Sequence, residues 1–462
     1  MNLGFWIILY LLITVVIGVL ASRFIHSSSD FLSTSRRLPL ILNASALFAF
    51  WYGSETVLGA SSEFIQHGLL GVIEDPFGGF LCLILFALIF VRPLYRKNIL
   101  TLGDLFRNVY GPKIERLSSA LMILSFFGYA AAQIIALGIL FHTIFGLDET
   151  MGRLISAVLV MAYTTAGGMW SVSITDFIQS VIIIVGLVFI TLFLFNMVDP
   201  STLFQSDNPY FFDFVPVRHP DVSWMDYVAA WCALGLGSLA SQDIFQRANA
   251  ARSESIAVRS TYLGASLYLL FAMLPLLLGL MVFQLSPELV ADNTQHALMT
   301  MIAQYTPMWL QVLFYGALTS AIFSTCSGAL LAPSSLLAEN LLKPVLYPDS
   351  SDSQLLRLSR ISVVIVSILA TVLALMSESI YHLVSQSSIL GMVSILVPLY
   401  AALFHGNSQK PMGAWLSMSC GLGTYILFEL FPIETVPSMF LGFGASIIGL
   451  LSGNKMGKKY WI

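Results

Sequence analysis

Long apolar stretches separated by short polar segments run along the whole chain. A transmembrane helix needs about 20 mostly apolar residues, and the pattern predicts an all-α, polytopic membrane protein with about thirteen such spans. The connections around 198–224 and 284–307 are too short for a separate soluble domain. The predicted spans cover residues 4–22, 40–60, 72–91, 117–143, 151–168, 174–197, 225–243, 259–283, 308–332, 359–377, 383–404, 411–430 and 435–452.

The composition agrees with a bilayer environment. Of the 462 residues, 57% are hydrophobic and 10% are charged, and the mean hydropathy is +0.84. Soluble domains carry about 25% charged residues, so a water-soluble enzyme is nearly excluded. The four cysteines (Cys82, Cys232, Cys326 and Cys420) lie in apolar stretches without Cys-x-x-Cys spacing. We interpret them as small core residues and expect neither a disulfide framework nor a zinc site.

The basic residues lie almost entirely on one side of the predicted topology. Lys and Arg are retained in cytoplasmic loops, which places the N-terminus outside and the C-terminus in the cytoplasm of a plasma (inner) membrane. The segment 5–21 lacks a basic start and a clear cleavage site, so we expect a retained anchor helix. The cytoplasmic set is Arg23, Arg36, Arg37, Arg92, Arg96, Lys97, Arg107, Lys113, Arg116, Arg247, Arg252, Arg259, Lys343, Arg357, Arg360, Lys410, Lys455, Lys458 and Lys459; the other set is Arg153 and Arg218.

Two predicted helices contain polar, glycine-bearing interruptions. The second has Gly53, Ser54, Glu55 and Thr56 in mid-span, and the seventh has the segment 235–243. Paired interrupted helices in corresponding positions are typical of inverted-repeat transporters, and unwound backbone offers carbonyl oxygens to a small cation. The alternatives are small-residue helix contacts, with Glu55 near the membrane interface.

A further expectation concerns Asp243 and Arg247 in that seventh helix. They are spaced i, i+4, so we interpret them as an ordinary cytoplasmic ion pair.

Two other helices carry polar stripes. In the ninth, Ala321, Ser324, Thr325 and Gly328 share one face, and uncharged oxygens suit sodium better than a transition metal; hydroxyls bonded to their own helix are the alternative. In the sixth, Asp176 lies on a stripe with Ser173 and Ser180, which suits a buried ion site. Asp176 could equally be a first-turn acid favoured by the helix dipole.

At these positions the chain resembles the sodium:solute symporter family over residues 4–452, nearest the branch that contains choline transporters. The segment 163–179 resembles the family's Gly-Gly…Thr-Asp…Gln signature, and 244–247 and 321–325 resemble further family blocks. The resemblance implies a LeuT-like fold in one transmembrane domain (1–462). Its expected parts are an N-terminal extra helix and loop (1–39), a first five-helix repeat (40–197), a second, inverted repeat (225–404) and two C-terminal helices (411–452).

The resemblance also implies ion and solute sites, with Na⁺ as the coupling ion and no other cofactor. The sodium site would use backbone carbonyls of Ala49, Tyr52 and Ala321 with the hydroxyls of Ser324 and Thr325. A second sodium site would use Asp176 with Ser327, although Gly328 stands where such members carry a second serine. The expected solute contacts are Tyr52, by cation–π attraction, Thr56, Asp75, Ser241 and Gln386, whereas Gly79 and Ser241 occupy places where the choline branch has aromatic residues.

Together these features predict a sodium-coupled symporter that imports a small polar organic solute, an amine or a hydroxyl-rich compound, by alternating access. Its partners would be the solute, Na⁺ and membrane lipid, with no nucleic acid. We do not expect an enzyme, because the histidines are scattered at span ends rather than clustered at catalytic spacing. The alternatives are a proton-coupled carrier of the same fold, with Glu55 or Asp176 as its proton site, and a transporter-like solute sensor.

Overall fold

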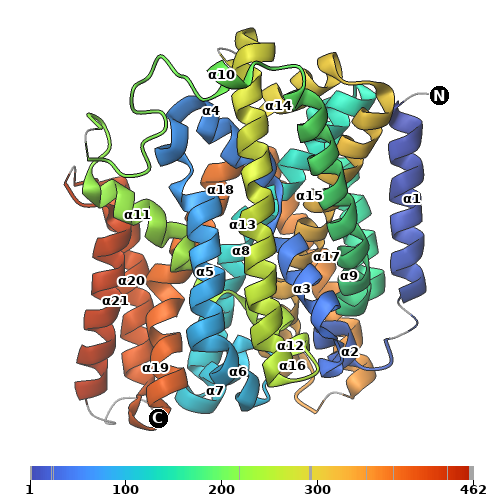
Figure 1. The fold of residues 1–462 in the computed structure, drawn as a ribbon. Helices are drawn as coiled ribbons and strands as arrows, with labels where there is room; N and C mark the ends of the chain where they lie inside the picture. The colour runs from blue at the N-terminus through green and yellow to red at the C-terminus, as the bar shows by residue number, and fades with distance from the viewer. Residues whose placement is uncertain are drawn as a thin grey trace.

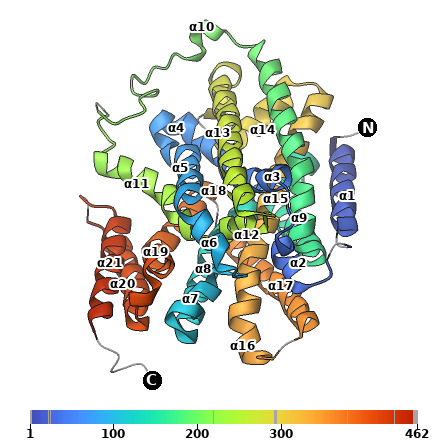
Figure 2. The same cartoon turned by 60° about the horizontal axis from the view of Figure 1, so that its bottom comes forward.

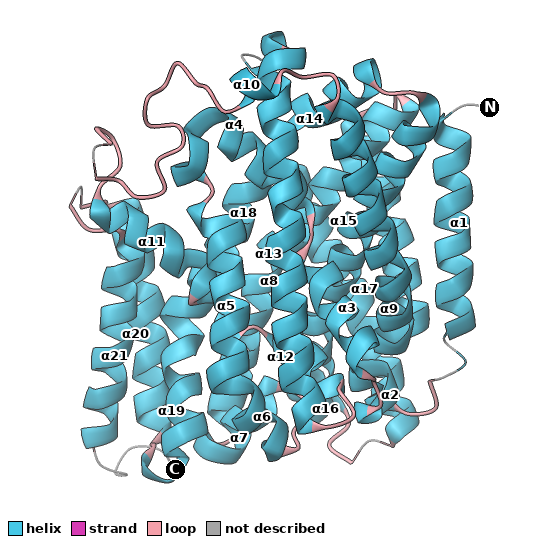
Figure 3. Ribbon diagram, viewed as in Figure 1, coloured by secondary structure: helices cyan, strands magenta, loops and turns pink. Residues whose placement is uncertain are grey.

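The computed structural model describes residues 3–21, 23, 25–217, 219–290, 294–349, 351–377, 379–433 and 435–456. The described chain folds into helices joined by loops, the longest of them between α10 and α11, with no strand in these ranges (Figure 3). Arg218, Lys458 and Lys459, which were assigned to loops from the sequence, lie outside the described residues.

The α-helices of the described chain have the following bounds. They are α1 (Leu3–Ala21), α2 (Ser28–Ser33), α3 (Leu40–Trp51), α4 (Ala60–Gly71), α5 (Gly79–Leu85), α6 (Val91–Lys97), α7 (Leu102–Tyr110), α8 (Pro112–Phe145), α9 (Glu149–Phe195), α10 (Pro200–Leu203), α11 (Trp224–Gly235), α12 (Gln242–Ala250), α13 (Glu254–Leu285), α14 (Thr294–Tyr305), α15 (Met308–Leu336), α16 (Lys343–Leu346), α17 (Asp352–Met376), α18 (Ile380–Gly391), α19 (Val397–His405), α20 (Pro411–Leu430) and α21 (Ser438–Lys455).

Short helical segments connect or extend several of them. These are η2 (Thr34–Arg36), η3 (Glu55–Gly59), η4 (Ile73–Gly78), η5 (Phe86–Phe90), η6 (Gly237–Ala240), η7 (Pro287–Val290), η8 (Leu337–Leu342), η9 (Met392–Leu396) and η10 (Gly406–Ser408).

All thirteen predicted stretches lie on these helices. By length and composition, seven continuous helical segments of the described chain are able to cross a membrane, and α11–η6 with α12 forms an eighth, bent by 56°. Helix α9 contains two of the predicted stretches. The four stretches not yet accounted for lie on α1, α3, α20 and α21. The first described residue of α1 and the last of α21 lie at opposite ends of the bundle (Figure 1), as an odd number of crossings requires.

The 47-residue α9 reverses sharply at Gly168, where φ is +48° and ψ is −155°. A side chain is rarely tolerated at such a φ. A Cβ at this position would also lie 2.4 Å from the ring of Phe31 on α2. The turn between two predicted spans is therefore a single glycine packed beneath Phe31.

Both predicted helix interruptions are present. Helix α3 ends at Trp51, and helical structure resumes only after Tyr52 and Gly53. The other break separates α11–η6 from α12 at Ser241, whose backbone is extended. A Cβ on Gly237, just before this break, would lie 2.5 Å from the backbone oxygen of Ser388 on α18, so only glycine fits this close approach.

The bundle has a central group of helices with added helices at two edges. The apolar part of α15 is 94% buried, against 44% for α9, so α15 is central. The helix α1 packs against α9 at one edge, and the pair α20–α21 lies at the opposite edge (Figures 1 and 2). One expectation needs correction here: Cys420 is exposed rather than a core residue. Within the connection 284–307, the chain forms helix α14.

A buried polar cluster ties α7, α8 and η8 together at the end of the bundle where α21 ends. The side-chain amide of Asn340 donates to Asp104 (3.0 Å) and to Glu115 (2.9 Å), and its oxygen accepts from the hydroxyl of Thr101 (2.7 Å). Every polar atom of this amide has a partner, so Asn340 links α7, α8 and η8 at this end of the bundle.

Candidate functional site

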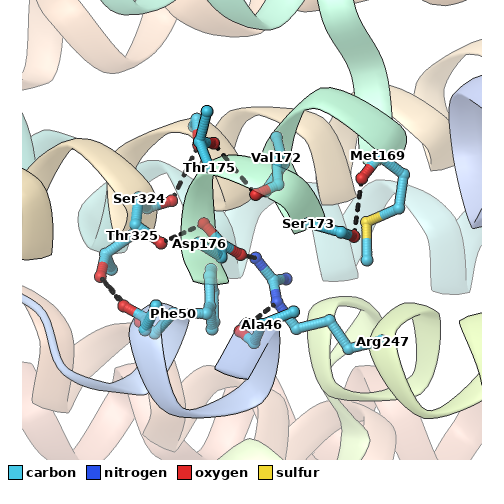
Figure 4. A network of polar contacts seen from close by, with 12 residues as sticks. Ala46, Phe50, Met169, Val172, Ser173, Thr175, Asp176, Arg247, Ser324 and Thr325 are labelled. Carbon is cyan, nitrogen blue, oxygen red and sulfur yellow. Dashed lines mark hydrogen bonds and ion pairs between the residues drawn. The ribbon is translucent and has the colours of Figure 1, made fainter. Parts of the chain in front are cut away.

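The break after α3 lies against the middle of α15. The hydroxyl of Thr325 is 2.8 Å from the carbonyl oxygen of Phe50, 3.2 Å from that of Ala49 and 3.0 Å from that of Ala321 (Figure 4). All of these groups are buried. The fold therefore gathers four uncharged oxygens from two helices at one point, which is the ligand chemistry that a small hard cation prefers.

The other two residues of the expected sodium site have different partners. Ser324 donates a 2.6 Å hydrogen bond to Asp176. The side chain of Tyr52 donates to the carbonyl oxygen of Phe271 at 2.8 Å, and Tyr52 and Ala321 both line a small apolar cavity. The structure thus brings Ala49, Ala321 and Thr325 together directly, with Ser324 turned to Asp176 and Tyr52 contributing to the neighbouring cavity.

Asp176 is fully buried, and its second carboxylate oxygen lies 3.9 Å from the guanidinium of Arg247. This position corrects two expectations. Arg247 is not part of an exposed cytoplasmic pair with Asp243, because its buried side chain reaches Asp176 instead; Asp243 accepts from Ser241. Asp176 is also not a first-turn acid, because it lies about two turns beyond the reversal at Gly168.

Hydroxyls bonded to their own helix, the alternative considered for the ninth predicted helix, are present there: Thr325 donates to the carbonyl oxygen of Ala321 and Ser327 to that of Ser324. The same bonding occurs in the sixth predicted helix, where Ser173 donates to the carbonyl oxygen of Met169 and Ser180 to that of Asp176. The Ser327 hydroxyl is therefore turned towards its own helix rather than towards Asp176.

A cavity lies between the two helix breaks, α8 and α18. Its lining includes three acidic residues and four aromatic ones, and no Lys, Arg or His of the described chain. The charged and aromatic lining residues are Glu55, Asp75, Asp243, Phe50, Trp51, Phe126 and Tyr129; small residues at the second break, including Gly237, Ser238 and Ser241, and Ser387 and Ser388 on α18 complete much of the wall.

Two of these acids have several hydrogen-bond donors. Asp75 accepts from Tyr268 at 2.7 Å and from Thr56 at 3.2 Å. Glu55 accepts from Tyr129 at 2.9 Å and from Gln133 at 2.7 Å. Glu55 is only 3% exposed, so its carboxylate is enclosed by the protein rather than facing the surface of the bundle.

Among the expected solute contacts, Asp75 and Ser241 line the cavity, and Thr56 lies behind Asp75 as its hydrogen-bond donor. Tyr52 lies beside the smaller cavity instead. Gln386 is exposed and does not line the cavity. Because residues three and four apart share a helix face, the positions 384, 387, 388 and 391 of α18 face the cavity and Gln386 does not.

The sequence reasoning missed the aromatic and amide residues that surround the acids. Tyr268 lies where Gly79 leaves room, since a Cβ on Gly79 would be 2.9 Å from the Tyr268 hydroxyl. Tyr129 and Gln133 lie four apart on α8, and this spacing was the one available signal for a shared partner. An aromatic ring from another helix, that of Tyr268, therefore lies beside Gly79.

Comparison with known proteins gives consistent matches over most of the chain. The sequence model of the sodium:solute symporter family matches residues 31–421. High-affinity choline transporter 1 of Drosophila melanogaster is 26% identical over 464 aligned positions, covering 94% of this chain and 74% of that protein. The high-affinity proline transporter PutP of Bacillus subtilis is 27% identical over 460 positions, covering 94% of each. The predicted relation to choline transporters is confirmed.

Solved structures show the same fold. A Na⁺-coupled sialic acid symporter in a substrate-bound, outward-open state superposes with a TM-score of 0.83 at 19% identity, covering 99% of this chain and 98% of that one. The nucleobase-cation symporter Mhp1 gives 0.60 at 12% identity, covering 94% and 96%. Both have LeuT-like folds, so the predicted fold class is confirmed, and the related proteins are transporters. Since the family model matches well over half of its residues, the chain belongs to the sodium:solute symporter family.

Proposed function

We propose that this protein is a sodium-coupled symporter that imports a small organic solute bearing an amine, by alternating access. The observation that carries the solute class is the cavity between the two helix breaks, which has three acidic lining residues and no basic one among the described residues. Buried charge is costly unless it is compensated, so a cationic group fits this cavity better than an anion. Aromatic faces such as that of Tyr129 add cation–π attraction.

Sodium would bind between α3 and α15. Its proposed ligands are the carbonyl oxygens of Ala49, Tyr52 and Ala321 and the hydroxyls of Ser324 and Thr325. The support is the gathering of Thr325 with the carbonyls of Ala49 and Ala321 within 3.2 Å. An ion there would tie the broken helix to α15 and favour one conformation of the pair, and its release into the cytoplasm would free both helices.

Uptake into proteoliposomes tests this function. Radiolabelled choline, ethanolamine and proline, with a sugar and a dicarboxylate for comparison, would be offered with an imposed inward sodium gradient. We expect an amine to accumulate only with the gradient, and the Ser324→Ala, Thr325→Ala double variant to lose this accumulation. Uptake of a carboxylate alone would contradict the solute class, and gradient-driven uptake by the double variant would contradict the ion site.

Proton coupling is the second candidate, and the buried Glu55 favours it. Glu55 would be the proton site, held by Tyr129 and Gln133. Uptake driven by a proton gradient without sodium would support this candidate, and it would contradict sodium coupling.

We also propose a plasma-membrane location with the N-terminus outside and the C-terminus in the cytoplasm. The uneven distribution of Lys and Arg supports this orientation. A membrane-impermeant maleimide applied to intact cells should label a cysteine introduced at Asp207 but not one at Arg107, in a chain whose four native cysteines are replaced. The reverse pattern would invert the topology.

A further inference from the structure

Two of the three acids that line the cavity lie on the side of the first helix break. The segment η3 begins at Glu55, just after that break, and Asp75 of η4 accepts from the hydroxyl of Thr56, the next residue, at 3.2 Å. The side-chain donors that these two carboxylates have in the described chain are hydroxyl and amide groups. Such donors supply hydrogen bonds but no positive charge. We call Glu55 and Asp75 the first pole of the cavity.

The third acid lies at the second helix break. Asp243 is in the first turn of α12, two residues after Ser241, and its Oδ1 atom accepts from the Ser241 hydroxyl. Its other carboxylate oxygen, Oδ2, is buried and has no hydrogen-bond partner within the described residues, and the residue as a whole is 2% exposed. A buried acceptor without a donor is costly, so this oxygen points to a donor that comes with a ligand. We call Asp243 the second pole.

Neither pole takes part in an ion pair of the described chain. Arg247, one turn further along α12, is directed to Asp176 at 3.9 Å, and the described lining of the cavity contains no basic residue. One sodium ion and a singly charged amine would leave one of the three carboxylates uncompensated, and buried charge is costly in that state. One sodium ion and a solute with two positive charges would balance all three.

Most of the remaining lining is aromatic, aliphatic or small. Phe126 and Tyr129 lie three apart and therefore share one face of α8, and they are joined in the lining by Phe50, Leu234 and Val384. An apolar wall with a few polar groups at defined points is typical of sites for small organic molecules. This wall suits a methylene chain that joins two polar ends.

We propose that the solute is a short aliphatic diamine, with an ammonium group at each end of the chain. This inference rests on the proposed transport of an amine and specifies its class. One ammonium group binds at the first pole, between Glu55 and Asp75. The other donates to Oδ2 of Asp243, and the methylene chain lies against the aromatic wall.

Calorimetric titration of the purified full-length protein in sodium buffer tests the proposal with two probes of equal length. 1,4-Diaminobutane has two ammonium groups, whereas 4-amino-1-butanol has a hydroxyl in place of one of them. We expect the diamine to bind at least about thirtyfold more tightly, because the loss of one partner of a buried charge pair lowers affinity by that factor or more.

Asp243→Asn should abolish this preference, because a neutral amide does not favour an ammonium group over a hydroxyl. The shape of the side chain is kept, and binding of 4-amino-1-butanol through the first pole should persist. The matched control is Asp226→Asn, at an exposed acid in the first turn of α11. Its preference for the diamine should equal that of the wild type.

Equal binding of the two probes by the wild type would overturn the diamine inference and leave amine transport intact. If neither probe binds, the inference is wrong; binding of choline in the same assay would then preserve the amine function, and its absence would overturn both. A preference that persists in a folded Asp243→Asn protein would overturn the placement of the second ammonium group at Asp243. If this variant does not fold, the wild-type ratio decides between a diamine and a monoamine.

Discussion

The hydroxyl of Thr325 lies 2.8 Å from the backbone oxygen of Phe50, although the two residues are 275 positions apart. This contact joins the central helix α15 to the end of α3, where the helix is interrupted. A single hydroxyl therefore connects the two halves of the proposed sodium site.

Replacing Thr325 by Val keeps the shape of the side chain and removes this hydroxyl. Hydrogen bonds to charged groups contribute about 1.5–3 kcal/mol, and 1.4 kcal/mol corresponds to tenfold in affinity, so we expect apparent sodium affinity to fall at least about tenfold. Sodium-dependent uptake gives the measurement. Thr319→Val is the control, because that hydroxyl bonds the backbone oxygen of Tyr315 in its own helix; equal losses in both variants would contradict the assignment.

Asp75→Asn removes one of the three acids from the cavity while keeping hydrogen-bonding capacity towards Tyr268 and Thr56. Loss of one partner of a buried charge pair costs about 2–5 kcal/mol, so the apparent affinity for an amine solute should fall at least about thirtyfold. Competition uptake measures this change. Asp207→Asn, at an exposed loop position, should leave affinity unchanged, and an unaltered Asp75→Asn protein would remove Asp75 from the solute site.

Gly237→Ala should impair transport and stability together. The added Cβ would meet the backbone oxygen of Ser388 at 2.5 Å, and overpacking of this kind costs about 1–3 kcal/mol. Thermal unfolding in detergent and initial uptake rates give the two readouts. Gly423→Ala on the exposed face of α20 has nothing within 4 Å of its Cβ, so it should not be destabilised.

Asn340→Ala should loosen the end of the bundle at α7. The change removes one hydrogen bond each from Thr101, Asp104 and Glu115, and a buried group left unpaired costs about 1–3 kcal/mol. Thermal unfolding should therefore occur at a lower temperature. Asn196→Ala serves for comparison, because that exposed side chain bonds only the backbone oxygen of Leu192; an equal loss there would argue against a specific role for Asn340.

The sequence predicts the helices well because the bilayer fixes the length of a span and requires most of its residues to be apolar. It also predicts both interruptions, since Gly and Ser in mid-span are local signals. The partners of the buried acids could not be predicted in this way. Tyr268 reaches Asp75 across 193 positions, and Arg247 reaches Asp176 only because of how α12 packs against α3.

The position of Gln386 illustrates the same limit at smaller scale. Helix α18 does line the cavity, but the face it turns to the cavity depends on its rotation, which one polar residue does not determine. The proximity of Thr325 to the break after α3 was easier to predict, because it depends on a motif in α15 and on that break rather than on a rotation.

The packing of Phe31 over Gly168 has a consequence for the order of assembly. Since synthesis proceeds from the N-terminus, α2 with Phe31 emerges well before the hairpin turn of α9 that it covers. The early helices can thus serve as a template on which the later hairpin closes. A chain that began at residue 40 would have to form this hairpin without its cover, and we expect it to be retained by quality control during biogenesis rather than to reach the membrane as a working transporter.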